Sequence, residues 1–253
     1  MPRYLVTIEY DGTPFVGWQR QDNGLSVQTV MERAADALEE GAHEVYGAGR
    51  TDSGVHALAM TAHVDFHKSW PDDVVRDALN HHLRPHPVAV LSAQRVSDEF
   101  HARFSAVKRG YIYRLIDRRA PLALDAGRAW QVRVTLDADA MNMAAQSLVG
   151  THDFTTFRDA QCQADSPVKS IDAIRVERDG ECITLKVEAI SFLHRQIRSI
   201  TGSLVEVGRG RWSVEDFRDA LGAADRTRCG PVAPPDGLYL AFVNYPPALL
   251  ESP

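Results

Sequence analysis

A glycine-rich loop between two strand-like segments constrains the fold of this chain more than any other feature. The stretch Gly47–Ala57 holds three glycines in eleven residues, and strand-like sequence flanks it at residues 43–46 and 58–66. Glycine adopts backbone conformations that other residues avoid, and it lets another molecule approach the chain closely. Proteins place many of their reactive groups on loops carried by a rigid scaffold. The stretch therefore predicts a loop that carries reactive side chains.

Asp52 is the only carboxylate in this loop, and Arg50 lies two residues before it. In extended backbone the two side chains project to the same side. A nearby cation favours the ionised carboxylate, which is the form that a carboxylate nucleophile needs. An Arg-x-Asp pair in a glycine-rich turn is more often a structural ion pair than a catalytic site. The residues alone leave both interpretations open.

The composition is that of a soluble globular protein, with 44% hydrophobic and 25% charged residues. The 253 residues suffice for one large domain or two of ordinary size. No apolar run is long enough to cross a membrane, and the N-terminus leads directly into a strand pattern, so no signal peptide is expected. The three cysteines are far apart, which predicts neither a disulfide framework nor a metal site and fits a reducing cytoplasm.

The net charge of −6 argues against a nucleic-acid partner, but the charge is unevenly distributed. Residues 100–119 carry six cations, two tyrosines and a single acid, Asp117. Local charge matters more than total charge for an RNA-binding face. This stretch therefore predicts contact with RNA. Its cations are Arg103, Lys108, Arg109, Arg114, Arg118 and Arg119.

Hydrophobic periodicity predicts alternating strands and helices. Strands are expected at residues 3–10, 58–66, 88–96, 106–117, 128–134, 168–177, 182–190 and 237–245. Helices are expected at 27–38 with Ser26 as N-cap, from Pro71 to the prolines at 85 and 87, at 137–148, at 192–207 and from Ser213 onward. Asp179-Gly180 predicts a hairpin turn. The order predicts an α+β fold with two subdomains, residues 1–100 and 101–253.

An ordered set of motifs spans nearly the whole chain and resembles the tRNA pseudouridine synthase A family. The motifs are Glu9–Gly12, Gly17–Gln21, the loop Gly47–Ala57, Asp98–Ala106, Tyr111–Tyr113, Gly150–Phe154, Phe157-Arg158, Phe192–Val207 and Gly237–Leu240. The resemblance implies two α/β-type subdomains that share one mixed, mostly antiparallel sheet, with helices on one face and a central active-site cleft. It also implies a cytoplasmic homodimer that isomerises uridines in the anticodon stem-loop of tRNA, at nucleotides 38, 39 and 40.

The resemblance also implies the site residues. Asp52 matches the family's catalytic aspartate, and Arg198 matches an arginine that pairs with it. Tyr111 matches the active-site tyrosine that restricts the target uracil, and Arg50 matches the loop arginine that contacts RNA. Whether Asp52 attacks the sugar, attacks the base or removes a ribose proton is left open. The segment from Gly17 to Gly24 is either a plain solvated loop or a loop that contacts the RNA backbone, and only the resemblance favours RNA contact.

The reaction exchanges a C–N bond for a C–C bond without any redox change, so no cofactor and no metal ion is expected. His56 could act as a general base, but a polar group in a loop more often bonds to backbone, so a structural hydrogen bond is expected for it. Ser199 departs from the family, whose members often carry asparagine there.

Two other functions fit parts of the sequence. A non-catalytic RNA-binding module would use the basic and aromatic stretch at 100–119 for stacking and phosphate contacts. It would leave the Arg50–Asp52 loop without a purpose. An aspartate-nucleophile hydrolase would need metal-binding carboxylates that the sequence does not offer.

Overall fold

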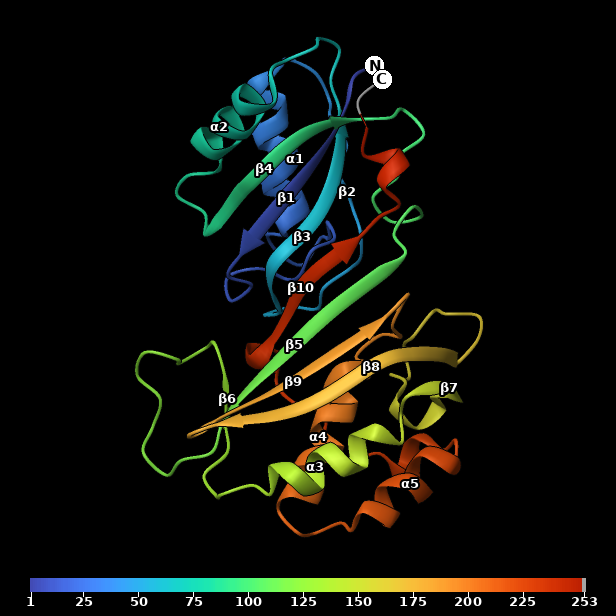
Figure 1. The fold of residues 1–253 in the computed structure, drawn as a ribbon. Helices are drawn as coiled ribbons and strands as arrows, with labels where there is room; N and C mark the ends of the chain where they lie inside the picture. The colour runs from blue at the N-terminus through green and yellow to red at the C-terminus, as the bar shows by residue number, and fades with distance from the viewer. Residues whose placement is uncertain (252–253) are drawn as a thin grey trace. The chain divides into compact units, whose positions relative to one another are not determined.

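The computed structural model describes residues 1–251, which form ten strands and five α-helices of an α+β fold (Figure 1). The strands make a mixed, mostly antiparallel sheet that does not close, so the predicted fold class is confirmed. They are β1 (Arg3–Tyr10), β2 (Tyr46–Gly47), β3 (His56–Asp65), β4 (Val88–Val96), β5 (Lys108–Ile116), β6 (Trp130–Gln131), β7 (Gly150–Asp153), β8 (Val168–Asp179), β9 (Cys182–Ala189) and β10 (Leu238–Asn244). The helices are α1 (Val27–Leu38), α2 (Asp72–Leu83), α3 (Ala138–Gln146), α4 (Gln196–Gly208) and α5 (Val214–Gly222).

The chain packs as two compact units. The first contains residues 1–109 together with the segment from Tyr239 onward, and the second contains residues 110–238. The sequence predicts subdomains of residues 1–100 and 101–253. That division stays a prediction.

The first unit is built around β1. Its strand order is β4-β1-β3-β10, and β2 adds to β3. The even-numbered residues Tyr4, Val6 and Ile8 have no exposed surface, as the alternation in the sequence predicts. Helices α1 and α2 pack on each other, and α2 packs on β4 (Figure 1). Ser26 caps α1 as expected, since its hydroxyl accepts the Thr29 N–H at 3.1 Å.

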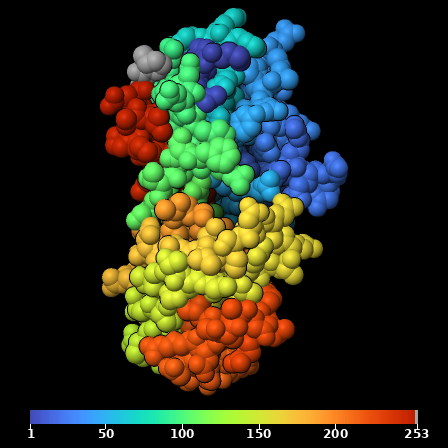
Figure 2. Space-filling model, turned by 90° about the vertical axis from the view of Figure 1, so that its right-hand side faces the viewer, coloured from blue at the N-terminus to red at the C-terminus, as the bar shows by residue number. Residues whose placement is uncertain are grey.

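The end of the chain returns to the first unit. β10 pairs in parallel with β3 through Tyr239 and His56. The Tyr245 hydroxyl donates to the Ala102 carbonyl at 2.8 Å. Leu249 packs against a cluster that includes buried Phe100. Figure 2 shows this red terminal segment lying against green residues of the first unit.

The second unit has the strand order β5-β9-β8-β7, and β6 adds to β5. Helices α3, α4 and α5 pack together, and α3 lies on β8 (Figure 1). The expected hairpin joins β8 to β9, but Asp179 pairs with Cys182, so the turn residues are Gly180 and Glu181. Gly180 has φ +57°, which explains glycine at this position. The capping box of α5 at Ser213 is present.

Helix α4 begins four residues later than predicted, at Gln196 and not at Phe192. The reason is Arg195, which adopts a left-handed conformation with φ 55° and ψ 12° and therefore cannot belong to a right-handed helix. The Gln196 side chain accepts the Leu193 N–H at 2.7 Å and satisfies the backbone before the helix. The predicted strand at 128–134 shortens to Trp130–Gln131.

Across residues 1–251, every helix is too short or too polar to span a bilayer.

We predict that His63 makes the first unit sensitive to acid. Burial, the nearby Arg3 guanidinium and His101 lower the pKa of His63 to about 4, from about 6.5 in an unfolded chain. Its Nδ1 accepts the Ala102 N–H at 3.1 Å, which a protonated ring cannot do in the same way. The unfolded chain therefore takes up the proton first, and stability falls as the pH drops from 6.5 towards 4. The expected loss between pH 6.5 and pH 5 is about 2 kcal/mol.

Urea denaturation of the wild type and of His63→Asn at these two pH values measures this loss. Asparagine keeps an acceptor for the Ala102 N–H but does not titrate, so its pH dependence should be shallower by about the same amount. An NMR titration should place the midpoint of the His63 ring near pH 4. A midpoint near 6.5 would contradict this account.

Candidate active site

The predicted loop connects β2 to β3 in the first unit. These short antiparallel strands pair Tyr46 with His63 and Gly47 with Ala62, and the Ala48 N–H donates to the Thr61 carbonyl at 2.8 Å. The sheet therefore holds the start of the loop, and β3 holds its end at His56.

The residue before Asp52 is fixed by contacts with the segment after β1. The Thr51 carbonyl accepts the Trp18 N–H at 3.1 Å, and the Thr51 hydroxyl bonds to the Tyr10 hydroxyl at 2.9 Å. Gly17 has φ +112°, and a Cβ there would lie 2.4 Å from the Thr51 carbonyl oxygen. Trp18 is only 3% exposed, so the expectation of a solvated loop is wrong at this residue.

The residues after Asp52 form a tight turn. The Val55 N–H donates to the Asp52 carbonyl at 3.1 Å, and Gly54 has φ +78°. The Ser53 hydroxyl donates to the Phe15 carbonyl at 3.2 Å. A Cβ on Gly12 would lie 2.0 Å from the Val55 carbonyl oxygen. Backbone contacts on both sides of Asp52 therefore set its position.

Asp52 itself is half-buried, whereas Arg50 is exposed. Within residues 1–251, no hydrogen bond or ion pair joins Arg50 to Asp52. The simple structural interpretation of this pair is therefore wrong, and the Arg50 side chain extends into solvent.

His56 has the structural role expected for it. It is 2% exposed, and its Nδ1 accepts the Gly12 N–H at 3.0 Å. The ring stacks on Tyr239 with a centroid distance of 4.7 Å. These contacts attach the end of the loop to the segment after β1 and to β10.

At least three cations of the predicted basic stretch bind protein groups. Arg109 is 9% exposed, and its Nε and Nη2 donate to the Ala48 carbonyl at 3.1 and 2.7 Å. Arg114 pairs with Asp125 and Arg118 with Glu181, each at 3.0 Å. These three guanidinium groups are therefore already engaged by protein, while the predicted RNA contact of the stretch as a whole stays a prediction. Sequence could not reveal this, because their partners lie elsewhere in the chain.

The two tyrosines of β5 in the second unit have different environments. Tyr113 has no exposed surface and donates its hydroxyl to the Pro234 carbonyl at 2.7 Å, and burial raises its pKa. Tyr111 is half-buried, and its ring packs edge to face on the Phe192 ring with 5.3 Å between the ring centroids. Tyr113 is thus a core residue, and Tyr111 is the one with accessible surface.

Arg198 is the exception in α4, because the twelve other residues of this helix are buried and Arg198 is half-buried. Its Nε donates to the Ala233 carbonyl at 2.8 Å, and its own carbonyl accepts the Ala233 N–H at 3.0 Å. The segment containing Ala233 packs closely on the helix, since a Cβ on Gly202 would lie 1.6 Å from the Pro231 carbonyl oxygen. The guanidinium is therefore oriented by a firmly packed partner.

Arg195, three residues earlier, does not share a helical face with Arg198, because it lies outside α4. Its Nη1 pairs with Asp159 at 3.0 Å. The predicted helix from residue 192 would place Arg195 and Arg198 on neighbouring faces, and the left-handed backbone of Arg195 shows that this placement is wrong.

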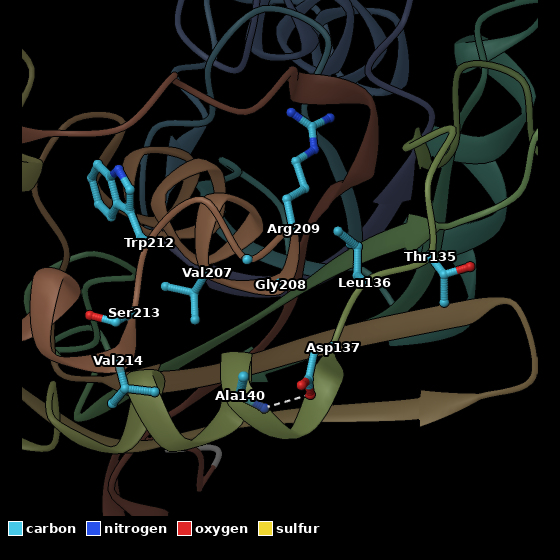
Figure 3. A pocket seen from close by; sticks show the side chains of 11 residues that line it. Thr135, Leu136, Asp137, Ala140, Val207, Gly208, Arg209, Trp212, Ser213 and Val214 are labelled. Carbon is cyan, nitrogen blue, oxygen red and sulfur yellow. Dashed lines mark hydrogen bonds between the residues drawn. The ribbon is translucent and has the colours of Figure 1, made fainter.

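A separate hollow of about 590 Å³ lies in the second unit near the end of α4 (Figure 3). Val207, Arg209 and Trp212 contribute to its wall. Asp137 also lines it and uses its carboxylate to cap α3 at Ala140. None of the predicted site residues lines this hollow.

Comparison with known proteins decides the family. The family described as tRNA pseudouridine synthase matches residues 6–105 and 144–246, which include the loop around Asp52 and helix α4. The chain is 67% identical to tRNA pseudouridine synthase A of Maricaulis maris over 246 residues, covering 97% of this chain and 99% of that protein. The chain belongs to the tRNA pseudouridine synthase A family. The expected enzyme class, an isomerase, is thereby confirmed.

Other members of the synthase family match over similar lengths. The enzyme of Afipia carboxidovorans is 62% identical over 97% of this chain and 100% of its own length. That of Azorhizobium caulinodans is 56% identical over 100% of this chain and 98% of its own length. The likeness therefore spans both compact units of this synthase.

We predict that Gly202→Ala impairs both stability and activity of the synthase. The new Cβ would displace the Pro231–Ala233 segment, which should cost about 2 kcal/mol or more and shift the carbonyl that holds Arg198. Gly222→Ala is the matched control, since a Cβ there meets no atom within 4 Å. Urea denaturation and turnover on tRNA measure both effects. Equal behaviour of the two variants would contradict the packing argument.

Proposed function

We propose that this synthase converts uridine to pseudouridine in the anticodon stem-loop of tRNA, at nucleotides 38, 39 and 40, with Asp52 as its nucleophile. Family membership supports uridine isomerisation in tRNA. The observation that carries the assignment of Asp52 is the anchored loop, in which the flanking backbone is bonded on both sides while the carboxylate is half-buried. The stem-loop positions rest on the resemblance of the motifs.

The chemistry requires a group such as Asp52. The C–N glycosidic bond must break, the base must be held while it turns, and its C5 proton must leave after the C–C bond forms. A carboxylate that attacks the anomeric carbon or the base splits this exchange into easier steps. A carboxylate on rigid backbone is already positioned for the transition state, because little conformational freedom remains to be lost.

Tyr111 and Arg50 bind the substrate in this proposal. The Tyr111 ring, with accessible surface beside Phe192, restricts the flipped uracil by contact with its face. The exposed Arg50 guanidinium contacts phosphate or takes the place of the flipped nucleotide. Several neighbouring uridines are accepted because the enzyme recognises the shape of the stem more than base identity.

Arg198 keeps Asp52 ionised and oriented in this proposal. A guanidinium carries five N–H donors, and in half-buried Arg198 the Nε donor is bonded to the Ala233 carbonyl. Its pairing with Asp52 stays a prediction. So do the cytoplasmic location and the homodimer that the resemblance implies.

The competing function is RNA binding without catalysis. It drew on the basic stretch at 100–119, and three cations of that stretch bind protein groups. The experiments below distinguish the two functions, because a binding module shows no turnover.

Asp52→Asn should abolish turnover. Asparagine preserves the size of the side chain but is not a nucleophile, so the release of tritium from tRNA labelled at C5 of uridine should fall about 1,000-fold or more. Filter binding of the tRNA should change by no more than about threefold, since one carboxylate among many phosphate contacts is replaced. Asp77→Asn, on the exposed face of α2, is the control and should retain full turnover.

The same assay tests the substrate positions. A tRNA with cytidine in place of uridine at nucleotides 38, 39 and 40 should release no tritium. Release from that tRNA would contradict the positions, whereas full turnover by Asp52→Asn would contradict the nucleophile.

Arg198→Ala should reduce turnover about 100-fold, because the carboxylate loses the cation that stabilises and orients it. Arg195→Ala is the matched control and should lose no more than about threefold, since Arg195 pairs with Asp159. Added guanidinium ion should restore part of the turnover of Arg198→Ala, which a purely structural loss would not permit. Equal losses in the two variants would remove the assigned role.

A further inference from the structure

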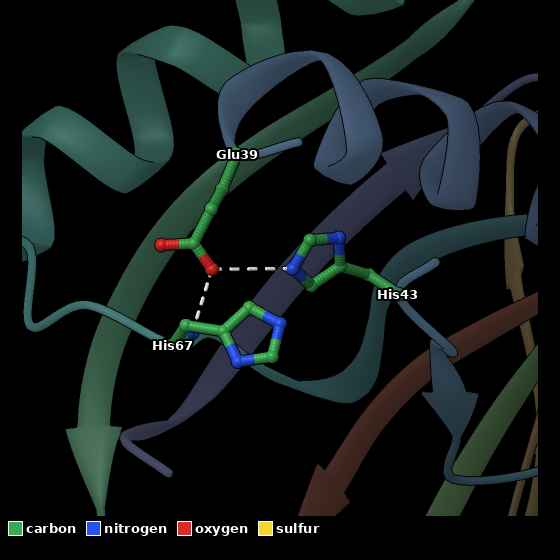
Figure 4. A group of neighbouring side chains, drawn as sticks. All are labelled: Glu39, His43 and His67. Carbon is green, nitrogen blue, oxygen red and sulfur yellow. Dashed lines mark hydrogen bonds and ion pairs between the residues drawn. The ribbon is translucent and has the colours of Figure 1, made fainter. Parts of the chain in front are cut away.

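A second group of chemically active side chains lies in the first unit. Glu39, His43 and His67 each offer a potential metal-ligand atom, and these atoms lie within 4.8 Å of one another (Figure 4). Glu39 follows the last turn of α1, His43 lies in the connection towards β2, and His67 follows β3. Within residues 1–251, no other set of three or more His, Cys, Asp or Glu residues brings its potential ligand atoms this close together.

The Glu39 carboxylate is held in one orientation. Its Oε1 accepts the Lys68 N–H at 3.0 Å and lies 3.4 Å from the Trp70 indole nitrogen. Its Oε2 accepts the His67 backbone N–H at 2.6 Å and lies 3.3 Å from His43 Nε2. Oε2 therefore faces the two histidines (Figure 4).

The His43 ring is held equally firmly. It is 6% exposed, and its Nδ1 lies 3.1 Å from Asp36 Oδ1, which also accepts the His43 backbone N–H at 2.8 Å. A carboxylate at Nδ1 favours a proton there and leaves the Nε2 lone pair directed at Glu39. Protein metal sites orient their histidine ligands by this carboxylate–histidine arrangement.

We propose that Glu39, His43 and His67 bind one divalent transition-metal ion of the zinc class. Tetrahedral zinc with bonds of about 2.0–2.1 Å places neighbouring ligand atoms about 3.4 Å apart, and Nε2 of His43 and Oε2 of Glu39 are 3.3 Å apart. His67 is exposed, so its ring can turn inward by rotation about its side-chain bonds. Two imidazoles and one carboxylate are a ligand set that suits zinc, and water completes the fourth position.

The competing interpretation needs no ion. A protonated His43 between Asp36 and Glu39 would account for the same two short contacts. The two interpretations differ at His67, because Glu39 accepts the His67 backbone N–H and not its ring. Removing the His67 side chain therefore eliminates a metal ligand and leaves the ion-pair contacts unchanged.

The ion would join three segments of the first unit and would take no part in the uridine chemistry. Binding to the folded state alone raises stability in proportion to the logarithm of free ion concentration. The site thus acts as a structural clip at the end of α1.

Isothermal titration calorimetry tests the proposal. The full chain is first freed of metals with a chelator and is then titrated with Zn²⁺. The wild type should bind one ion per chain, and His67→Ala should bind it at least about tenfold more weakly. His81→Ala, which removes an exposed histidine near the end of α2, should bind like the wild type. Without metal, all three proteins should unfold at the same temperature, and Zn²⁺ should raise that temperature in the wild type and in His81→Ala.

Three results would overturn the proposal. These are no stoichiometric binding by the wild type, equal affinity of His67→Ala, or loss of binding in His81→Ala, which would assign the ion to the adjacent His81 and His82.

Discussion

The close approach of two backbone segments governs the architecture around Asp52. Residues 12–18 lie so near residues 51–55 that side chains at Gly12 and Gly17 would overlap carbonyl oxygens of the loop. Peptide groups in such contact must satisfy each other, and they do so through Trp18 and Thr51. The Asp52 carboxylate is thus positioned by main-chain atoms, whose geometry depends less on the identity of neighbouring side chains.

Arginine plays a supporting role in both compact units. Arg109 donates two bonds to the Ala48 carbonyl at the start of the loop, and Arg198 donates to the Ala233 carbonyl beside α4. A guanidinium has five N–H donors, so it can bond to a carbonyl and still address a second group. For this reason, the number of arginines in a stretch of sequence does not show which of them bind RNA and which bind protein groups.

The sequence was sufficient for most elements, because β1, α1 and α5 carry patterns and caps that are local. The sequence was insufficient where contacts between residues far apart in the chain determine the local structure or the burial of a side chain. The start of α4 depends on one left-handed residue, Arg195, within an otherwise helical pattern. Tyr111 and Tyr113 lie two residues apart in β5, so the alternation of a strand places them on the same face. Of the two, only Tyr113 is completely buried. The grouping of Glu39 with His67 was equally hidden, since β3 and its turns separate them along the chain.

The return of the C-terminal segment has a consequence for the order of events during synthesis. β10 supplies the strand that pairs with the start of β3, and Tyr239 supplies the ring that stacks on His56. The ribosome synthesises these residues after the whole second unit. The first unit is therefore translated first but receives its β10 strand only after the second unit has been made. A nascent chain that ends before β10 lacks the Tyr239 ring that stacks on His56, and so lacks this support at the end of the loop around Asp52.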